Sequence, residues 1–178
     1  MTEIAERVDH TLLDKDAPVS AYDGLIETAE ELGMNVCLPP SRLDRVPESF
    51  GSEIVAVVGF PHGTTTPEAK AKEALLCVKA GATEVDMACN VSLLKSEEDE
   101  AFGDDVRAVA EAVSVPTKAI LETGLLSNDE KRRAARLCVE AGAEYVKTCT
   151  GYAPGEATVE DVRLLKDVVG DDARIKAS

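Results

Sequence analysis

The sequence predicts an α/β protein with a parallel sheet that closes into a barrel. Segments with the pattern of strands alternate with segments with the pattern of amphipathic helices along the chain, as in sheets with helical crossovers. The chain is 44% apolar, with three Phe, three Tyr and no Trp, which indicates aliphatic packing of helices on a sheet. Polar residues follow many of the strands. This favours a barrel over a doubly wound open sheet, because every strand end of a barrel can contribute to one active site.

Seven strand candidates, separated by helix candidates, follow from local signals. The clearest strand is the apolar run at 54–60, which is typical of a strand buried on both faces. The Thr66-Pro67 pair opens a helix with proline at its first position, and Gly81 ends it. The expected strands are 6–10, 35–39, 54–60, 84–90, 117–122, 145–148 and 174–177, and the expected helices are 21–32, a short one from 41, 66–80, 96–113, 127–142 and 158–169.

An internal repeat places three charged residues at equivalent strand positions. Segments 76–82 and 137–143 share the pattern Leu-Cys-Val-x-Ala-Gly-Ala at an offset of 61 residues, and each precedes a strand. The same offset relates Asp86 to Lys147, and one further helix and strand, about thirty residues, leads to Lys176. An amine held among neighbouring charges loses its proton more easily and is then a nucleophile towards carbonyls. The pattern therefore predicts Schiff-base chemistry.

Composition and charge exclude several classes of function. The formal net charge is −15, from 34 acidic against 19 basic residues, which argues against a broad basic surface for nucleic acid or an anionic membrane. The chain has neither a Gly-x-Gly-x-x-Gly fingerprint after its first strand nor a Walker-type loop, so the common nucleotide sites are not supported. A solvated acidic surface explains the charge, and a high-salt cytoplasm is an alternative that it also fits.

The cysteine and histidine content bears on metals and on the compartment. Five cysteines without a Cys-x-x-Cys pair make disulfides and a structural zinc site improbable, and two histidines do not provide a common catalytic metal site. The N-terminus is charged from Glu3 onward, and apolar runs are shorter than a membrane span. We therefore expect a cytoplasmic protein with no metal, no cofactor and no membrane partner.

Seven segments, in order along almost the whole chain, resemble deoxyribose-phosphate aldolases. They are Val8-Asp-His-Thr-Leu-Leu13, Asn35-Val-Cys-Leu-Pro39, Val57-Val-Gly-Phe-Pro-His-Gly63, Glu84-Val-Asp-Met87, Leu121-Glu-Thr-Gly-Leu-Leu126, Val146-Lys-Thr-Cys-Thr-Gly151 and Ile175-Lys-Ala-Ser178. The resemblance implies a (β/α)₈ TIM barrel and a class I aldolase that reversibly cleaves 2-deoxy-D-ribose 5-phosphate to acetaldehyde and D-glyceraldehyde 3-phosphate without a metal. The implied partners are small sugar phosphates and aldehydes, and a homo-oligomer is compatible with it.

The resemblance also implies roles for particular residues. Lys147 matches the lysine that forms the Schiff base, Lys176 the neighbouring lysine that favours its neutral form, and Asp86 the aspartate of the proton relay. The positions that resemble the substrate pocket are Thr11, Leu13, Thr150 and, for the phosphate, Gly151. A lysine at a strand end can also serve only to pair with an acid. The presence of two lysines and one acid at equivalent strand positions favours the catalytic interpretation over simple ion pairing.

The chain departs from the family pattern at its end. Family members continue beyond the Lys-Ala-Ser motif with a Gly-Gly turn, a helix and an eighth strand, whereas this sequence stops at Ser178, and Tyr152 stands where some members have Lys. We therefore expect one barrel domain over 1–178, incomplete at its C-terminus, with seven strands and the eighth βα unit missing. Two alternatives to the aldolase follow. One is a weakened fragment or remnant barrel that needs a partner or the missing segment, and the other is a related Schiff-base lyase for another aldehyde or sugar phosphate.

Five further residues have a structural interpretation. Cys37 and Cys149 lie near strand ends and could meet an aldehyde, but we interpret both as core thiols. Asp9 and His10 are not a catalytic dyad, because adjacent strand residues point to opposite faces, and we expect Asp9 to bond locally. His62 is expected to shape a loop.

Overall fold

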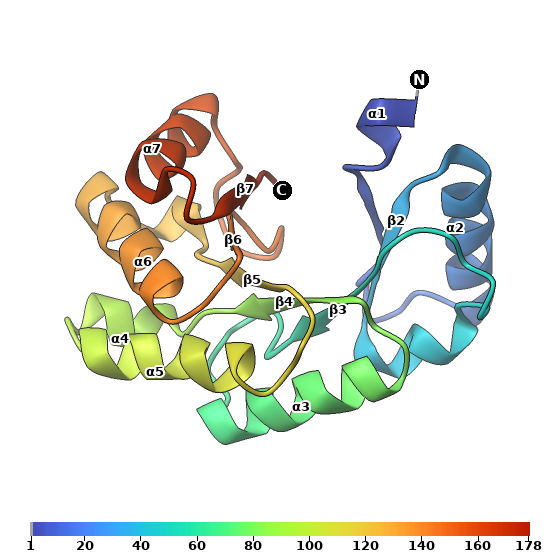
Figure 1. Ribbon diagram of the computed structural model, residues 1–178, viewed down its shortest axis with the longest axis horizontal. Helices are drawn as coiled ribbons and strands as arrows, with labels where there is room; N and C mark the ends of the chain where they lie inside the picture. Colours follow the sequence, from blue (N-terminus) through green and yellow to red (C-terminus); the bar gives the residue numbers. More distant parts are fainter. Residues whose placement is uncertain (1) are drawn as a thin grey trace.

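Seven parallel strands form one curled sheet in which the strand order follows the sequence, from β1 to β7 (Figure 1). The computed structural model describes residues 2–178. Each strand pairs in parallel with the next, as expected of strands joined by helical crossovers. The strands are β1 (Asp9–Thr11), β2 (Asn35–Leu38), β3 (Ile54–Val58), β4 (Glu84–Ala88), β5 (Thr117–Ile120), β6 (Tyr145–Lys147) and β7 (Arg174–Lys176). The predicted α/β fold is confirmed, with the seven strands curled as an open barrel.

Helices connect the strands and cover the outer face of the sheet (Figure 1). Two 3-10 segments, η1 (Pro40–Arg45) and η2 (Thr123–Leu125), follow β2 and β5. The helices are α1 (Thr2–Ala5), α2 (Val19–Leu32), α3 (Pro67–Lys79), α4 (Val91–Lys95), α5 (Asp99–Ala110), α6 (Asn128–Glu140) and α7 (Val159–Val169). The sequence did not predict α1, α4 or η2.

Side-chain caps and a glycine set several helix ends close to where the sequence predicts them. The Thr66 hydroxyl accepts the N–H of Ala69 at the start of α3. Ser127 and Glu130 form a complete capping box at the start of α6, each side chain accepting the backbone N–H of the other. Gly33 ends α2 with a φ of 68°, a left-handed conformation that glycine adopts without a steric penalty.

The helix expected at 96–113 is shorter than predicted, and an additional short helix precedes it. α4 begins directly after β4, and α5 begins only at Asp99. Between them Glu97 has a φ of 60°, which a continuous right-handed helix cannot contain. The Ser96 N–H bonds to the Ser92 carbonyl at 3.0 Å and closes α4. The separation of α4 from α5 depends on the left-handed backbone of Glu97 rather than on a glycine or proline. The sequence therefore carried no clear signal for this separation.

Aliphatic side chains fill the layer between the sheet and its helices. The largest cluster packs the outward faces of β3 to β6 against α3, α5, α6 and α7, and a second cluster packs β2 against α2. Within β4 the residues Val85 and Met87 face this outer core, so alternation turns Glu84 and Asp86 towards the inside of the barrel. The outer core is mostly apolar, apart from the buried ion pair of Lys70 on α3 with Asp105 on α5, whereas the inside of the barrel holds a larger charged cluster.

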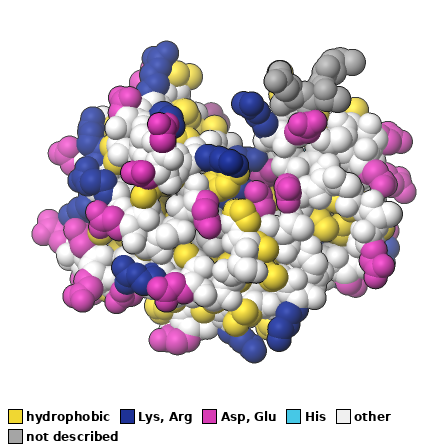
Figure 2. Space-filling view, viewed as in Figure 1, with side chains coloured by type: hydrophobic (Ala, Val, Ile, Leu, Met, Phe, Trp, Pro, Cys, Tyr) yellow, Lys and Arg dark blue, Asp and Glu magenta, His cyan; other side chains and the backbone are white. Residues whose placement is uncertain are grey.

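The open side of the curled sheet lies between β1 and β7. Within residues 2–178, β1 pairs only with β2 and β7 only with β6. A hollow of about 760 Å³ lies between these borders, and Figure 2 shows the surface hollowed between the two sides of the molecule at the top of the view. Charged side chains line it, including Arg7, Glu53, Glu84, Lys118 and Lys176.

The outer surface reflects the acidic composition. Asp and Glu side chains are spread over the visible face, interspersed with Lys and Arg, rather than gathered in one patch (Figure 2). On this face the acidic side chains behind the net charge of −15 therefore do not form a single patch. Among residues 2–178, none of the helices has the length and apolar character needed to cross a membrane.

Candidate active site

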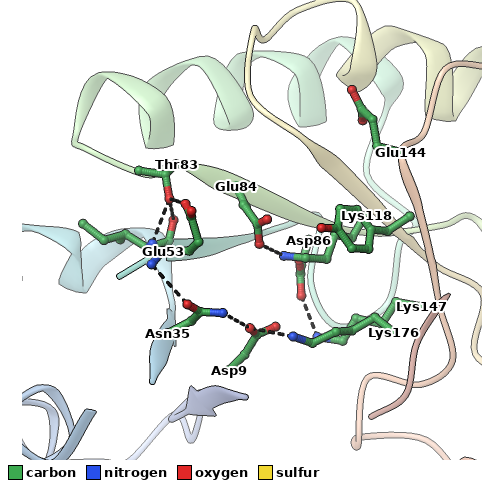
Figure 3. A network of polar contacts seen from close by, with 12 residues as sticks. Asp9, Asn35, Glu53, Thr83, Glu84, Asp86, Lys118, Glu144, Lys147 and Lys176 are labelled. Atoms are coloured by element: carbon green, nitrogen blue, oxygen red, sulfur yellow. Dashed lines mark hydrogen bonds and ion pairs between the residues drawn. The ribbon is translucent and has the colours of Figure 1, made fainter. Parts of the chain in front are cut away.

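Four charged side chains from consecutive strands gather inside the barrel: Asp86 on β4, Lys118 on β5, Lys147 on β6 and Lys176 on β7 (Figure 3). The strand register explains the grouping. Asp86 is the direct neighbour of Lys118 across β4 and β5, and Lys147 is the direct neighbour of Lys176 across β6 and β7. Neighbouring residues of a parallel pair point to the same face of the sheet, about 5 Å apart. Three predicted catalytic residues therefore share one space, and a fourth charge joins them.

The Asp86 carboxylate bridges two lysines. Its Oδ2 atom lies 2.5 Å from Lys147 Nζ, and its Oδ1 atom lies 2.9 Å from Lys118 Nζ. Asp86 is fully buried, so its charge would be costly without these partners. The repeat indicated that Asp86 and Lys147 occupy equivalent places, and the structure brings them into direct contact.

Lys118 is the residue that the sequence analysis missed. Its ammonium lies between the carboxylates of Asp86 and Glu84 and 5.6 Å from the centre of the Tyr145 ring. Burial alone would lower the pKa of Lys118, but the charge of Asp86, the hydrogen bond to Glu84 and the charge of Asp9 outweigh it and raise the pKa. One helix-and-strand unit separates Asp86 from Lys118, as it separates Lys147 from Lys176. This spacing is the sequence signal from which Lys118 could have been identified.

The amine of Lys147 is held in its charged form. Burial alone would lower the pKa of Lys147, but the Asp86 carboxylate, with smaller contributions from Cys37 and Asp9, raises it above the usual range. The expectation that neighbouring charge lowers this pKa is wrong for this structure, because the nearest charge is an acid rather than Lys176. To act as a nucleophile, Lys147 must first give up a proton, and the Asp86 oxygen at 2.5 Å can accept it.

Lys176 and Asp9 form the second ion pair of the site. Lys176 Nζ lies 2.7 Å from Asp9 Oδ1 and donates to the Arg7 carbonyl oxygen at 2.9 Å. The amide of Asn35 also donates to Asp9 Oδ1, at 3.1 Å. Asp9 therefore does not bond only locally, as expected, since its carboxylate links β1 to β2 and β7. Burial alone would raise the pKa of Asp9, but the hydrogen bond from Lys176 and the charge of Lys118 lower it.

Figure 3 shows these contacts as two polar chains that converge on the lysine pair. One chain runs from Glu84 through Lys118 and Asp86 to Lys147, and the other runs from Glu53 through Asn35 and Asp9 to Lys176. The second oxygen of Asp9, Oδ2, is buried and has no hydrogen-bond partner within residues 2–178. A buried oxygen of this kind can accept a proton donor from a water or a ligand in the site.

The four predicted substrate residues do not form one cluster. The Thr11 hydroxyl is exposed and donates to the Asp9 carbonyl oxygen at 2.8 Å. Leu13 packs with Phe60 over the end of β3 and lines a hollow of about 590 Å³. Thr150 is tied to Glu122 by its backbone and side chain. Gly151 has a φ of 82°, and a Cβ atom there would meet no atom within 4 Å, so its backbone is accessible.

Tyr152 connects the loop after β6 to the loop after β1. Its hydroxyl donates to Asp14 Oδ1 at 3.2 Å, and its ring meets Phe60 edge to face with centroids 5.3 Å apart. Burial and the Asp14 carboxylate raise the pKa of Tyr152, which therefore remains a neutral donor. Both rings line the same hollow as Leu13 and His62.

The two cysteines near the site are buried. Burial, with the charge of Asp86, raises the pKa of Cys37 to about 12, so its thiol stays protonated and is a weak nucleophile. Cys149 is also buried, with its sulfur 3.3 Å from the Thr123 hydroxyl. Both placements agree with their interpretation as core thiols. In the part of the chain described, no three His, Cys, Asp or Glu side chains are grouped to hold a metal ion.

The fold and the site define an α/β-barrel enzyme with a charged cluster inside the barrel, in which Lys147 and Lys176 are the last residues of β6 and β7. Residues 5–175 match the family model described as DeoC/LacD family aldolase. This chain belongs to that family.

Individual relatives agree over nearly the whole chain. The deoxyribose-phosphate aldolase of Shouchella clausii is 44% identical, and the alignment covers 99% of this chain and 82% of that protein. Among solved structures, the aldolase QR15 superposes with a TM-score of 0.95 at 31% identity, covering 99% of this chain and 81% of that one. The tetrameric deoxyribose phosphate aldolase of Aeropyrum pernix superposes with a TM-score of 0.89 at 30% identity, covering 98% of this chain and 76% of that one.

Proposed function

We propose that this chain is a class I aldolase that reversibly cleaves 2-deoxy-D-ribose 5-phosphate to acetaldehyde and D-glyceraldehyde 3-phosphate. The observation that carries the proposal is the buried Lys147–Asp86 pair, in which an amine and a proton acceptor lie 2.5 Å apart inside the barrel of an aldolase-family chain. Relatives named deoxyribose-phosphate aldolase, at 40–44% identity, support the choice of substrate. The pair supports a lysine-based reaction that needs neither metal nor cofactor.

Imine formation begins with a proton transfer. Asp86 takes a proton from the Lys147 ammonium, and the neutral amine adds to C1 of the open-chain sugar. Loss of water from the carbinolamine then gives the protonated imine. Because Lys118 holds the other oxygen of Asp86 at 2.9 Å, the carboxylate stays in place while its contact with Lys147 changes.

The imine then accepts the electrons of the carbon–carbon bond. A base removes the proton of the C3 hydroxyl, the C2–C3 bond breaks, and the bond electrons form an enamine on C1 and C2 as D-glyceraldehyde 3-phosphate leaves. Protonation at C2 and hydrolysis of the imine release acetaldehyde and regenerate Lys147. We assign these proton transfers to Asp86, acting through water.

Lys176 is assigned to the lysine pair as the residue whose positive charge partly offsets the effect of Asp86 on the pKa of Lys147. It is the direct neighbour of Lys147 across the strands, and a nearby like charge disfavours a second ammonium. Thr11, Leu13, Thr150 and Gly151 are assigned to substrate contacts. Of these, Leu13 lines the hollow of about 590 Å³, and Gly151 presents an accessible backbone.

The proposal extends to partners and compartment. We infer an enzyme of the cytoplasm that acts on small molecules, forms homo-oligomers and does not bind nucleic acid. The five cysteines are free, which suits a reducing compartment, and the charge of −15 disfavours nucleic acid. The Aeropyrum pernix relative is described as tetrameric. Sedimentation of the purified chain and fractionation of the producing cells test these statements.

Borohydride trapping tests the central claim. Reduction in the presence of acetaldehyde or the sugar phosphate should attach the substrate carbons to Lys147, because only an imine at that position can be reduced. Peptide mass spectrometry locates the adduct. An adduct on Lys176 with Lys147 unmodified would reverse the assignment, and restoration by a metal of activity lost to a chelator would refute the metal-free reaction.

A further inference from the structure

Glu122 combines a strained backbone with a buried carboxylate. It lies two residues after the end of β5 and has a φ of 58° and a ψ of 61°, a left-handed conformation that residues with a Cβ atom rarely adopt. The residue is 6% exposed. Both the strain and the burial of an acidic side chain cost free energy, so the surrounding structure must hold this residue in place.

The carboxylate of Glu122 is bound by Thr150, on the turn after β6. The Thr150 backbone N–H donates to Oε1 at 3.2 Å, and the Thr150 hydroxyl donates to Oε2. The same hydroxyl accepts the backbone N–H of Tyr152 at 3.1 Å. A threonine hydroxyl has one proton and two acceptor sites. With its proton given to Glu122 and one acceptor site used by Tyr152, it has one acceptor site left for a further partner.

Backbone contacts join the same two loops. The Thr123 N–H donates to the Thr148 carbonyl at 2.9 Å. A Cβ atom on Gly124 would lie 2.2 Å from the Pro154 carbonyl oxygen, and one on Gly155 would lie 2.7 Å from Gly124 Cα. Because neither glycine has room for a side chain, the loop after β5 lies directly against the loop between β6 and α7. The first loop thus forms a support for the second.

We propose that Glu122 is a positioning residue that presents the Thr150 hydroxyl to the substrate as a hydrogen-bond acceptor. Thr150 follows Lys147 by three residues, on the segment that leaves the carboxyl end of β6. By accepting the Thr150 proton, Glu122 fixes the direction of that hydrogen bond, and the remaining acceptor site suits a hydroxyl group of the sugar. This inference rests on the proposed function and assigns it a residue that the mechanism above does not use.

The chemistry predicts a particular effect of Glu122→Gln. The amide group of glutamine can still accept the Thr150 N–H, but its NH₂ would donate to the Thr150 oxygen and leave the hydroxyl proton pointing elsewhere. The shape of the site is kept while the direction of one hydrogen bond is reversed. Acetaldehyde alone has no hydroxyl to bind at Thr150, so imine formation with acetaldehyde should not depend on this change.

The experiment compares Glu122→Gln, Thr150→Val and the double variant. For cleavage of 2-deoxyribose 5-phosphate, each single variant should raise KM by about tenfold with a smaller change in kcat, as expected for a lost hydrogen bond to a substrate hydroxyl. The double variant should resemble the single variants, because both changes remove the same contact. Borohydride trapping of acetaldehyde on Lys147 should be lowered much less than cleavage in all three. Thr150→Ser, which keeps the hydroxyl, should raise KM much less than Thr150→Val.

Three results would overturn the proposal. They are equal losses of trapping and cleavage, multiplicative effects in the double variant, and a wild-type KM in Thr150→Val. If Glu122→Gln does not fold, the comparison of Thr150→Val with Thr150→Ser still decides the question. Failure of the proposed function is recognised separately, because the wild-type chain would then fail to trap acetaldehyde on Lys147 or to cleave the sugar phosphate.

Discussion

Lys176 at the end of β7 and Asp9 at the start of β1 form an ion pair, with Nζ 2.7 Å from Oδ1, across the side of the sheet where these two strands do not pair. The Asp9 side chain is 4% exposed and that of Lys176 is 19% exposed. A shielded pair of this kind loses less to solvent screening than a surface pair. It links the first and last strands, and it also places a fixed negative charge beside the lysine pair.

The Asp9 carboxylate should make the free energy of unfolding depend on pH in the acidic range. Its pKa is lowered in the folded chain, so its contribution is present above the pKa of the unfolded chain and is lost as the pH falls through the folded value. Urea unfolding from about pH 6 down to about pH 3 should therefore show a steeper loss of stability in the wild type than in Asp9→Asn. Parallel curves for the two proteins would contradict this assignment.

Lys176→Met should shift imine formation to more alkaline pH. The pKa of Lys147 is already raised by Asp86. Lys176 is the direct neighbour of Lys147 across the strands, and loss of a positive charge at that position should favour the ammonium further. The pH profile of acetaldehyde trapping should move up by roughly one unit. Lys176→Arg, which keeps the charge, is the matched control and should stay close to the wild type. An unaltered profile in Lys176→Met would show that Lys176 has another role.

Asp86→Asn should separate imine formation from proton transfer to carbon. Loss of the carboxylate removes the charge that raises the pKa of Lys147, so trapping of acetaldehyde should persist and extend to lower pH. Exchange of the acetaldehyde methyl protons into deuterated water should slow by about 100-fold or more, the usual effect of losing a general acid–base group. NMR measures the exchange directly. Wild-type exchange in the variant would exclude Asp86 from the relay.

The sequence predicted the strands of this fold well because the signals were local and repeated. The apolar run that forms β3 and the repeated helix-strand pattern before β4 and β6 both depend on residues close together in the chain. The same repeat predicted that Asp86 and Lys147 occupy equivalent positions on their strands. Helix α4 was missed because its end depends on the left-handed backbone of Glu97, a residue type with no preference for that conformation.

The electrostatics of the site could not be predicted from spacing. The repeat showed that Asp86, Lys147 and Lys176 share a face, but the sign of the Lys147 pKa shift depends on which charge is nearest. In the structure that charge is Asp86, at 2.5 Å, while Lys176 is held by Asp9. The roles of Lys118 and Glu122 depend on contacts across strands, which only the register of the sheet and the turns after β5 and β6 determine.

Lys118 offers the sharpest test of how the charged interior works. Its ammonium compensates the carboxylates of both Asp86 and Glu84, and its side chain is 1% exposed. Lys118→Met leaves two buried acids facing one another, so the free energy of unfolding should fall by about 3–5 kcal/mol, the usual cost of breaking a buried pair. Chemical denaturation measures this loss.

The double variant Lys118→Met with Glu84→Gln separates stability from catalysis. Removing the Glu84 charge relieves the repulsion, so most of the stability should return. Imine formation near neutral pH should nevertheless be slower than in the wild type. Asp86, freed from Lys118, pairs more strongly with Lys147 and raises the pKa of that amine further. Trapping rates across pH, compared with those of Glu84→Gln alone, give the answer. If the double variant recovers both stability and the wild-type trapping rate, Lys118 serves only to neutralise buried acids, and the proposal that it holds Asp86 for proton transfer is wrong.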